Sequence, residues 1–517
     1  MKLARKSFSK YFYILLLLII TLFLALPLDA KTTAYAFKAV SKTTANSKTA
    51  SSKTLSAQTQ SSTNQTSSVN SKNSLSSSYN NNLSSFISSY VNNSSGSTYT
   101  SSVISSYYNK SINNTYLSSS TSGSAISSSK VNSPSSSKTH SSVVSSKKVT
   151  SSRSSVSNHI PNVQLSTNKL IIGYYGGWSA YNGYTPDKIN ASHLNYINYS
   201  FAVIGSDLKI TVEDSTIDYS NFDKLNQLKA KYNGLKTNIA IGGWDGSQNF
   251  SAAAATPSSR QVFAQSCIDF IQKYGFDGIN LDWEYPASGG KLGNITSPSD
   301  KTNFTALLQE LRTQLDALGD TNGNHYSLSI AGGASYGYLN NIEPTKIANY
   351  IDYAVVMAYD IHGNWDSYSD FNAPLYSPQI SSPQYVWSDD ASIKAWSSRG
   401  FPASKLLLGV PFYGYVYSVT SSQNNGLFQP FSACKTAGYD TIMSKYYPDA
   451  AFAKLYQPQA MVPYLFNGNT FISYDDESSL ALKAKFALSN GLYGVSAWEL
   501  SFDRSGVLLN AMYEAMK

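Results

Sequence analysis

The chain has 517 residues, of which 42% are hydrophobic and 14% charged, and its formal net charge is +8. That charge is uneven: residues 31–165 contain twelve Lys and Arg but no Asp or Glu, whereas residues 166–517 contain 23 basic and 30 acidic residues. An acidic folded region does not suit a polyanion, so we expect no nucleic-acid partner.

Residues 1–36 have the pattern of a secretory signal peptide. Basic residues at positions 2–10 precede an apolar run at residues 11–28. Two possible signal-peptide cleavage sites with small residues follow, one ending at Ala30 and one at Ala36. The run is near the lower length limit of a membrane span, so an uncleaved anchor is the alternative. We predict cleavage, a secreted or cell-wall-associated protein, and no membrane contact afterwards, because no second long apolar segment occurs.

Residues 37–165 form a second region, in which Ser, Thr and Asn dominate and aliphatic residues are sparse. Such a segment buries too little apolar surface to offset its ordering entropy, so we predict a disordered basic linker. Its positive charge favours attraction to an anionic cell-wall polymer. The alternative is a plain solvated spacer.

Residues 166–517 are long enough for one large α/β domain. Apolar stripes at helical spacing occur at residues 263–274 and 304–318, between short strand-like runs. The eight runs are residues 169–175, 197–204, 237–243, 278–284, 326–332, 353–359, 406–412 and 493–498. Their alternation with helices predicts a (β/α)8 TIM barrel with catalytic groups at the carboxyl ends of the strands. A doubly wound sheet is the alternative, but no G-x-G-x-x-G turn follows the first run.

An additional segment, at about residues 415–475, separates the last two runs. Its mixed, aromatic composition indicates folded structure. Cys434 lies in this segment, whereas Cys267 lies on a helical stripe, so we expect two free cysteines. Two cysteines and five histidines without ligand spacing predict no metal site, and no cofactor is expected.

The stretch FDGINLDWEYP, residues 276–286, is the most informative part of the chain. As a strand it places Asn280, Asp282 and Glu284 on one face, and the alternating apolar residues between them on the other. A surface strand with one wet face is the alternative. The aromatic surroundings favour a buried polar row, which is costly to maintain without a function.

This stretch resembles the signature D-x-x-D-x-D-x-E of the family 18 glycoside hydrolases, the chitinase family. Asp277, Asp282 and Glu284 match three of the four acidic positions, and Asn280 replaces the second Asp. An amide there can donate to Asp282 but cannot exchange a proton. We therefore expect an altered pH profile and an unchanged reaction.

The resemblance continues through the other strand-like runs. Positions that match the family's binding or catalytic pattern are Tyr174, Phe201, Trp244, Met357, Tyr359, Asp360, Trp365, Tyr413 and Trp498. Ala240 replaces a Ser of that pattern, and Tyr415 stands where many members have Arg. The resemblance also implies that the additional segment is a small α+β insertion that forms one wall of a substrate cleft.

The roles that the resemblance implies do not require a second carboxylate across the cleft. Glu284 would protonate the leaving oxygen while the substrate's own 2-acetamido oxygen attacks the anomeric carbon. Asp282 would accept the acetamido N–H, and Tyr359 would hold the acetamido oxygen. Asn280 and the remaining matched positions would bind the sugar chain.

The leading hypothesis is a monomeric, secreted chitinase that cleaves β-1,4-linked N-acetylglucosamine polymers with retention of configuration. One alternative is an N-acetylglucosaminidase of the same family that acts on peptidoglycan or N-glycans. A chitin-binding lectin is the second alternative, and the presence of Glu284 argues against it.

Overall fold

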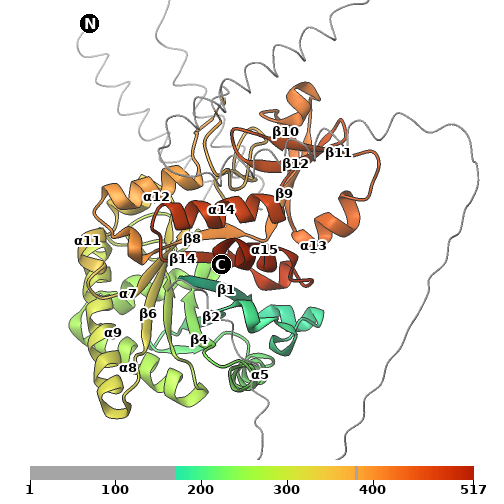
Figure 1. Cartoon of the computed structure of the whole chain (residues 1–517). Coiled ribbons are helices and arrows are strands. Elements are labelled where there is room, and N and C mark those ends of the chain that lie inside the picture. Colours follow the sequence, from blue (N-terminus) through green and yellow to red (C-terminus); the bar gives the residue numbers. More distant parts are fainter. Residues whose placement is uncertain (1–168, 379–381, 383) are drawn as a thin grey trace, which may run out of the picture. The chain divides into compact units, whose positions relative to one another are not determined.

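The computed structural model describes residues 169–378, 382 and 384–517. Parallel strands pair in sequence order and close between β1 and both β2 and β14, which makes a barrel (Figure 1). The eight barrel strands are β1 (Leu170–Gly176), β2 (Tyr196–Ile204), β4 (Lys236–Gly242), β5 (Gly278–Asp282), β6 (Ser327–Gly333), β7 (Tyr353–Met357), β8 (Leu406–Pro411) and β14 (Gly494–Trp498). A short strand, β3 (Ile210–Val212), adds antiparallel to β2. The predicted (β/α)8 barrel is confirmed.

Helices cover the outside of the barrel and bury the apolar outer faces of its strands. Longer helices include α5 (Asp218–Lys231), α8 (Pro257–Tyr274), α9 (Asp300–Asn322), α12 (Asp389–Ser398), α14 (Glu477–Ser489) and α15 (Val507–Met516). Shorter ones that follow strands include η1 (Gly177–Asn182), α6 (Gly243–Gly246), α7 (Phe250–Ala254) and α10 (Tyr336–Asn340). The apolar stripes predicted from the sequence are the buried faces of α8 and α9.

The motif strand β5 separates its side chains as the alternation predicts. Ile279 and Leu281 are fully buried, and Trp283 continues their side of the strand just beyond its end. The indole of Trp283 stacks on Phe250, with ring centroids 5.2 Å apart, and meets Phe304 of α9 edge to face. This packing anchors the end of β5 and turns the intervening polar side chains toward the barrel axis.

The segment between β8 and β14 folds into a five-stranded antiparallel sheet in the order β10-β9-β13-β12-β11. Its strands are β9 (Tyr413–Val419), β10 (Phe431–Gly438), β11 (Ala453–Gln457), β12 (Val462–Phe466) and β13 (Thr470–Ser473). The fully buried Lys483 on α14 ties the insertion to the barrel: its ammonium donates to Asp475 over 2.8 Å and lies 3.3 Å from Asp389. Buried charges are tolerated when they are paired in this way.

Cys267 and Cys434 are both free in the structure. Within the described part of the chain, no helix combines the length and the hydropathy needed to span a bilayer. The predicted signal peptide and linker, residues 1–36 and 37–165, lie outside the described residues and stay predictions.

Candidate active site

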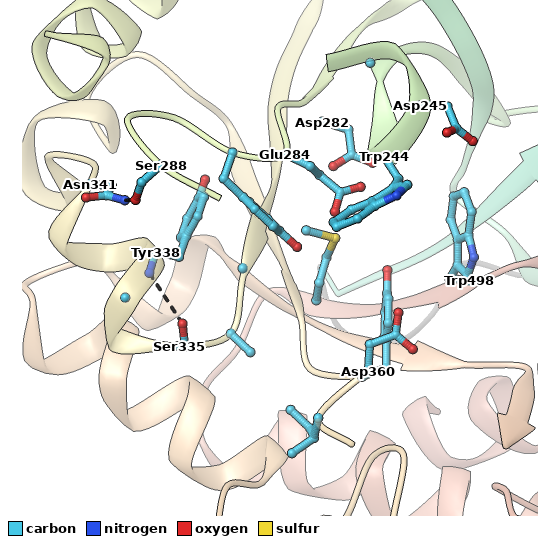
Figure 2. A pocket seen from close by; sticks show the side chains of 18 of the residues that line it. Trp244, Asp245, Asp282, Glu284, Ser288, Ser335, Tyr338, Asn341, Asp360 and Trp498 are labelled. Atoms are coloured by element: carbon cyan, nitrogen blue, oxygen red, sulfur yellow. Dashed lines mark hydrogen bonds between the residues drawn. The ribbon is translucent and has the colours of Figure 1, made fainter. Parts of the chain in front are cut away.

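An open cleft of about 820 Å³ lies at the carboxyl ends of the barrel strands. Its walls come from the ends of β2, β4, β5, β6, β7 and β14 and from the segments that follow the strands. This is the end of a (β/α)8 barrel where catalytic groups gather. Figure 2 shows side chains from separate strands turned toward the cleft.

Asp282 and Glu284 are the two acidic residues that β5 delivers to the cleft. Asp282 ends the strand and is 4% exposed, and Glu284 follows two positions later (Figure 2). The Glu284 backbone N–H donates to Ser247 Oγ over 2.9 Å, and its carbonyl accepts from Asn294 Nδ2 over 2.9 Å. These bonds determine where the Glu284 side chain enters the cleft.

Both carboxyl groups hold their protons unusually strongly. Burial raises the pKa of Glu284 to about 7 against the opposing effect of a hydrogen bond with the Tyr285 side chain, and the negative charges of Asp360 and Asp245 act in the same direction as burial. Burial also raises the pKa of Asp282 well above its usual range, with the charge of Glu284 adding to the effect. A carboxyl group that is still protonated near neutral pH can serve as a general acid.

Asn280 does not donate to Asp282, which corrects the expectation from the sequence. Its Nδ2 donates instead to Ser329 Oγ on β6 over 2.9 Å, and its Oδ1 accepts from the Tyr174 hydroxyl on β1 over 2.9 Å. The oxygen and the nitrogen of the Asn280 amide are therefore both hydrogen-bonded to neighbouring strands. Oδ1 of Asp282 is buried and has no hydrogen-bond partner among the described residues.

Two glycines let the chain turn sharply from β4 into α6. Gly242 and Gly243 have φ values of 104° and 72°, which side chains rarely tolerate. A Cβ on Gly243 would lie 2.6 Å from the Phe201 ring, and one on Gly242 would collide with the Asp282 carbonyl. The Gly-Gly pair thus allows close backbone approach and places Trp244 at the cleft.

Aromatic rings form the floor at one end of the cleft. The Trp498 ring stacks on Phe201, with centroids 5.8 Å apart, and lies 5.4 Å from Tyr174 and 6.3 Å from Trp178. Flat apolar surfaces of this kind pack well against the carbon faces of sugar rings. The arrangement suits a carbohydrate ligand.

Asp360 follows β7 and faces the cleft near Met357 and Tyr359. Two tyrosines of β9 hold it: the hydroxyls of Tyr413 and Tyr415 both donate to its Oδ1, over 2.5 Å and 2.8 Å. Its surroundings still raise the Asp360 pKa, because burial outweighs these two bonds. The insertion therefore reaches the site through its first strand.

The structure brings most of the sequence-predicted site residues together. Those that line the cleft are Phe201, Trp244, Asp282, Glu284, Met357, Tyr359, Asp360 and Trp498. Tyr174, Asn280 and Tyr413 lie behind this lining and act through hydrogen bonds to neighbouring residues. Trp365 does not line the cleft: it is 57% exposed and stands edge to face with Tyr415.

Comparison with known proteins agrees with this geometry. The sequence profile described as "Glycosyl hydrolases family 18" matches residues 170–503. Chitinase A1 of Niallia circulans is 36% identical over 403 residues, a match that covers 66% of this chain and 58% of that protein. The chain belongs to glycoside hydrolase family 18. The resemblance found in the sequence is thereby confirmed.

Solved structures of family 18 members superpose on the barrel. Chitinase ChiW from Paenibacillus sp. str. FPU-7 is 38% identical, with a TM-score of 0.63, over 67% of this chain and 32% of that chain. A family 18 N-acetylglucosaminidase from Paenibacillus barengoltzii is 32% identical, with a TM-score of 0.62, over 67% of this chain and 99% of that chain. The match thus spans 58% of chitinase A1 and 32% of ChiW, but 99% of the P. barengoltzii enzyme.

Several lining residues of this family 18 barrel were missed by the sequence reasoning. They include Trp178, Glu213, Asp245, Tyr285, Tyr338, Tyr385 and Trp387. Trp178 and Asp245 could have been found from their places directly after strand-like runs. Glu213 and Trp387 carry no such signal, because each lies in a long connection whose path only the folded barrel defines.

No group of three or more His, Cys, Asp or Glu side chains is placed to hold a metal ion within residues 169–378, 382 and 384–517. His362 instead lies between two carboxylates, 2.9 Å from Asp366 and 3.5 Å from Asp370. These contacts join parts of the connection that follows β7. The expectation of a reaction without metal or cofactor stays a prediction.

Proposed function

We propose that the protein is a chitinase that hydrolyses β-1,4-linked N-acetylglucosamine polymers by a substrate-assisted, retaining mechanism. The observation that carries this proposal is the unpartnered Oδ1 of buried Asp282 beside a Glu284 whose pKa is raised to about 7. A buried acceptor without a donor is costly, so it suits a ligand that brings an N–H group. An N-acetyl substituent supplies that group.

In the first step, Glu284 transfers its proton to the glycosidic oxygen as the bond to the leaving sugar breaks. The acetamido oxygen of the same sugar attacks its anomeric carbon, which gives a cyclic oxazolinium ion. Asp282 accepts the acetamido N–H through the oxygen that has no partner among the described residues, and this hydrogen bond holds the acetamido group in place for the attack. Tyr359 lines the cleft, and its hydroxyl donates to the acetamido oxygen.

In the second step, Glu284 is a carboxylate and removes a proton from the attacking water. Water opens the oxazolinium ion on the face that the leaving sugar vacated, so two inversions give net retention. Asp360 is a poor candidate for a protein nucleophile, because Oδ1 of its carboxylate already accepts two tyrosine hydroxyls. The aromatic floor around Trp498 supports the bound sugar.

A pH dependence follows from the raised pKa of Glu284. The acid is competent only when protonated, so kcat/KM is expected to fall as pH rises through about 7, roughly tenfold per unit above it. The measurement is a pH–rate profile on a soluble N-acetylglucosamine oligosaccharide. A plateau that extends two units above neutrality would contradict the assignment of Glu284 as the acid.

A second candidate function is hydrolysis of another N-acetylglucosamine glycan, peptidoglycan or an N-glycan core. The similarity to the N-acetylglucosaminidase of P. barengoltzii supports this second candidate. The lectin alternative is disfavoured because Glu284 is in place at the end of β5.

Parallel digestion of chitin, peptidoglycan and an N-glycan distinguishes these substrates. We expect soluble N-acetylglucosamine oligosaccharides from chitin and little release from the other two, measured by mass spectrometry of the products. Glu284→Gln protein serves as the control for contaminating activity. Faster release from peptidoglycan or from the N-glycan would replace the chitinase proposal with the second candidate.

A further inference from the structure

Asp300, the first residue of α9, is a fully buried residue whose carboxylate lies outside the cleft. It is not among the described residues that line the cleft. Its Oδ1 accepts from Ser251 Oγ on α7 over 2.7 Å, and its Oδ2 accepts from the backbone N–H groups of Ala287 and Ser297 over 3.2 Å and 2.8 Å. Three donors from separate segments thus converge on one carboxylate, and hydrogen bonds to a charged acceptor are stronger than neutral ones.

Ala287 and Ser297 are the two ends of a segment between β5 and α9, which we call the β5–α9 loop (residues 287–297). Asp300 closes this loop at its base, because one oxygen accepts from both ends. Ala287 has a φ of 66°, a left-handed conformation that residues other than glycine rarely adopt. The bond from its N–H to Asp300 stabilises this uncommon backbone conformation.

The closed loop packs on the backbone of Glu284. Asn294 Nδ2 in the loop donates to the Glu284 carbonyl over 2.9 Å. Gly290 comes so close that a Cβ there would lie 2.0 Å from the same carbonyl oxygen. A loop that moved outward would release this part of the backbone. The position of the proton donor therefore depends on how the loop is closed.

Two further contacts tie the β5–α9 loop to its surroundings, and both lie on exposed surface. Lys291 pairs with Asp245 over 2.6 Å. Asn341 Nδ2 donates to Ser288 Oγ over 2.8 Å, and Figure 2 shows these two side chains beside each other. Exposed polar contacts contribute little to stability. Among these contacts, the buried Asp300 carboxylate is the strongest restraint on the loop.

We propose that Asp300 is a positioning residue for Glu284: by closing the β5–α9 loop, it holds the proton donor in place without touching the substrate. This inference rests on the proposed function. Proton transfer depends on geometry, and a misplacement of about 1 Å can cost roughly a hundredfold in rate. The aromatic floor of Phe201 and Trp498 comes from other strands and stays in place when the loop loosens.

A second consequence concerns the pKa of Glu284, which burial raises to about 7. When the loop opens, water reaches the carboxyl group and its pKa falls toward the usual value of about 4.3. The reaction needs the protonated acid, so the alkaline limb of kcat/KM moves to lower pH. In the described part of the chain, the titratable groups that act on Glu284 are the carboxyls of Asp245, Asp282 and Asp360 and the hydroxyls of Tyr174, Tyr285, Tyr338 and Tyr359. Replacing Asp300 leaves all of these side chains in the protein.

The test compares Asp300→Ala with Asp300→Asn in pH–rate profiles on a soluble fluorogenic N-acetylglucosamine oligosaccharide. Alanine removes all three hydrogen bonds. Asparagine removes the charge but can keep the bonds, because its amide oxygen accepts from the two backbone N–H groups and its amide nitrogen donates to Ser251 Oγ.

We expect Asp300→Ala to lower kcat about ten- to hundredfold with KM within about twofold of the parent, and to move the alkaline limb down by about one pH unit. Asp300→Asn is expected to stay within about threefold of the parent in kcat, with the limb in place.

Asp503→Ala is the matched control for a general loss of stability. Asp503 is also buried and accepts from three backbone N–H groups, at the start of α15. Its replacement should lower the unfolding temperature and leave the alkaline limb in place.

An Asp300→Ala protein with kcat within about threefold of the parent and an unmoved limb overturns the proposal. An Asp300→Asn protein that is impaired as strongly as Asp300→Ala also overturns it, because the charge and not the closure of the loop would then be responsible.

If Asp300→Ala does not fold, Asn294→Ala interrupts the same chain of contacts at the bond to Glu284. We expect a loss of about three- to tenfold in kcat and a limb shifted in the same direction, and an unchanged kcat and limb overturns the proposal. Failure of the parent protein to cleave the neutral oligosaccharide at all would overturn the proposed function instead.

Discussion

Replacing Glu284 with glutamine is expected to lower kcat by roughly 10²–10⁴-fold, because it removes the one group that transfers a proton in both steps. The amide has almost the same shape as the carboxyl group, and two of the hydrogen bonds that position Glu284 come from its backbone, at Ser247 and Asn294. The side chain therefore stays in the cleft, and sugar binding is expected to persist.

The measurement for Glu284→Gln pairs steady-state hydrolysis of a soluble oligosaccharide with calorimetric binding of the same ligand. Retained affinity with lost turnover identifies a proton-transfer role. Asp320→Asn, which changes an exposed carboxylate in the last turn of α9, serves as a control for the effect of removing one carboxylate. Turnover within about tenfold of the parent would mean that another group supplies the proton.

Partly deacetylated chitosan is expected to yield products whose new reducing ends are all N-acetylated. In the substrate-assisted mechanism, the nucleophile belongs to the sugar that is cleaved at its anomeric carbon. A glucosamine unit at that position lacks the carbonyl oxygen and cannot form the oxazolinium ion. Nuclear magnetic resonance or mass spectrometry of the product ends measures this directly, and frequent glucosamine there would indicate a protein nucleophile or direct attack by water.

The same mechanism predicts tight inhibition by a thiazoline analogue of the intermediate, because enzymes bind transition-state-like species far better than substrates. Asp282→Ala should weaken that inhibitor and lower kcat together. The side chain's Oδ1 has no hydrogen-bond partner among the residues that the structure describes, so its removal takes away a contact with the ligand and no observed internal bond to that atom. An unchanged affinity for the thiazoline would remove Asp282 from the mechanism.

Local patterns in the sequence were enough to predict the barrel and the pair of carboxylates that β5 brings to the cleft. The strands are short apolar runs and the helices carry stripes of period 3.6, and both depend on neighbours within one element. Asp282 and Glu284 are two positions apart at the end of β5, so the period of a strand already places them on one face. The family signature at the same positions assigned their roles.

The hydrogen-bond and ion-pair partners of the motif's polar side chains lie far away along the chain. Asn280 was expected to donate to Asp282, but Tyr174 and Ser329, 106 and 49 positions away, occupy its amide. Asp277 matches the same signature, yet it pairs with Lys229 over 2.9 Å where β5 begins, away from the cleft. Membership in a motif did not reveal these partners.

Closure of the barrel between β1 and β14 brings the first and last strands into contact, and with them Tyr174 and Trp498. The sequence alone determined which residues form strands and which carboxylates share a face, because these follow from periodicity within single elements. Only the tertiary structure decided that Glu213, Asp245 and Asp360 share one cleft, whose lining includes no basic residue in the described part of the chain. Their meeting depends on strand order and on the paths of long connections, which no local pattern specifies.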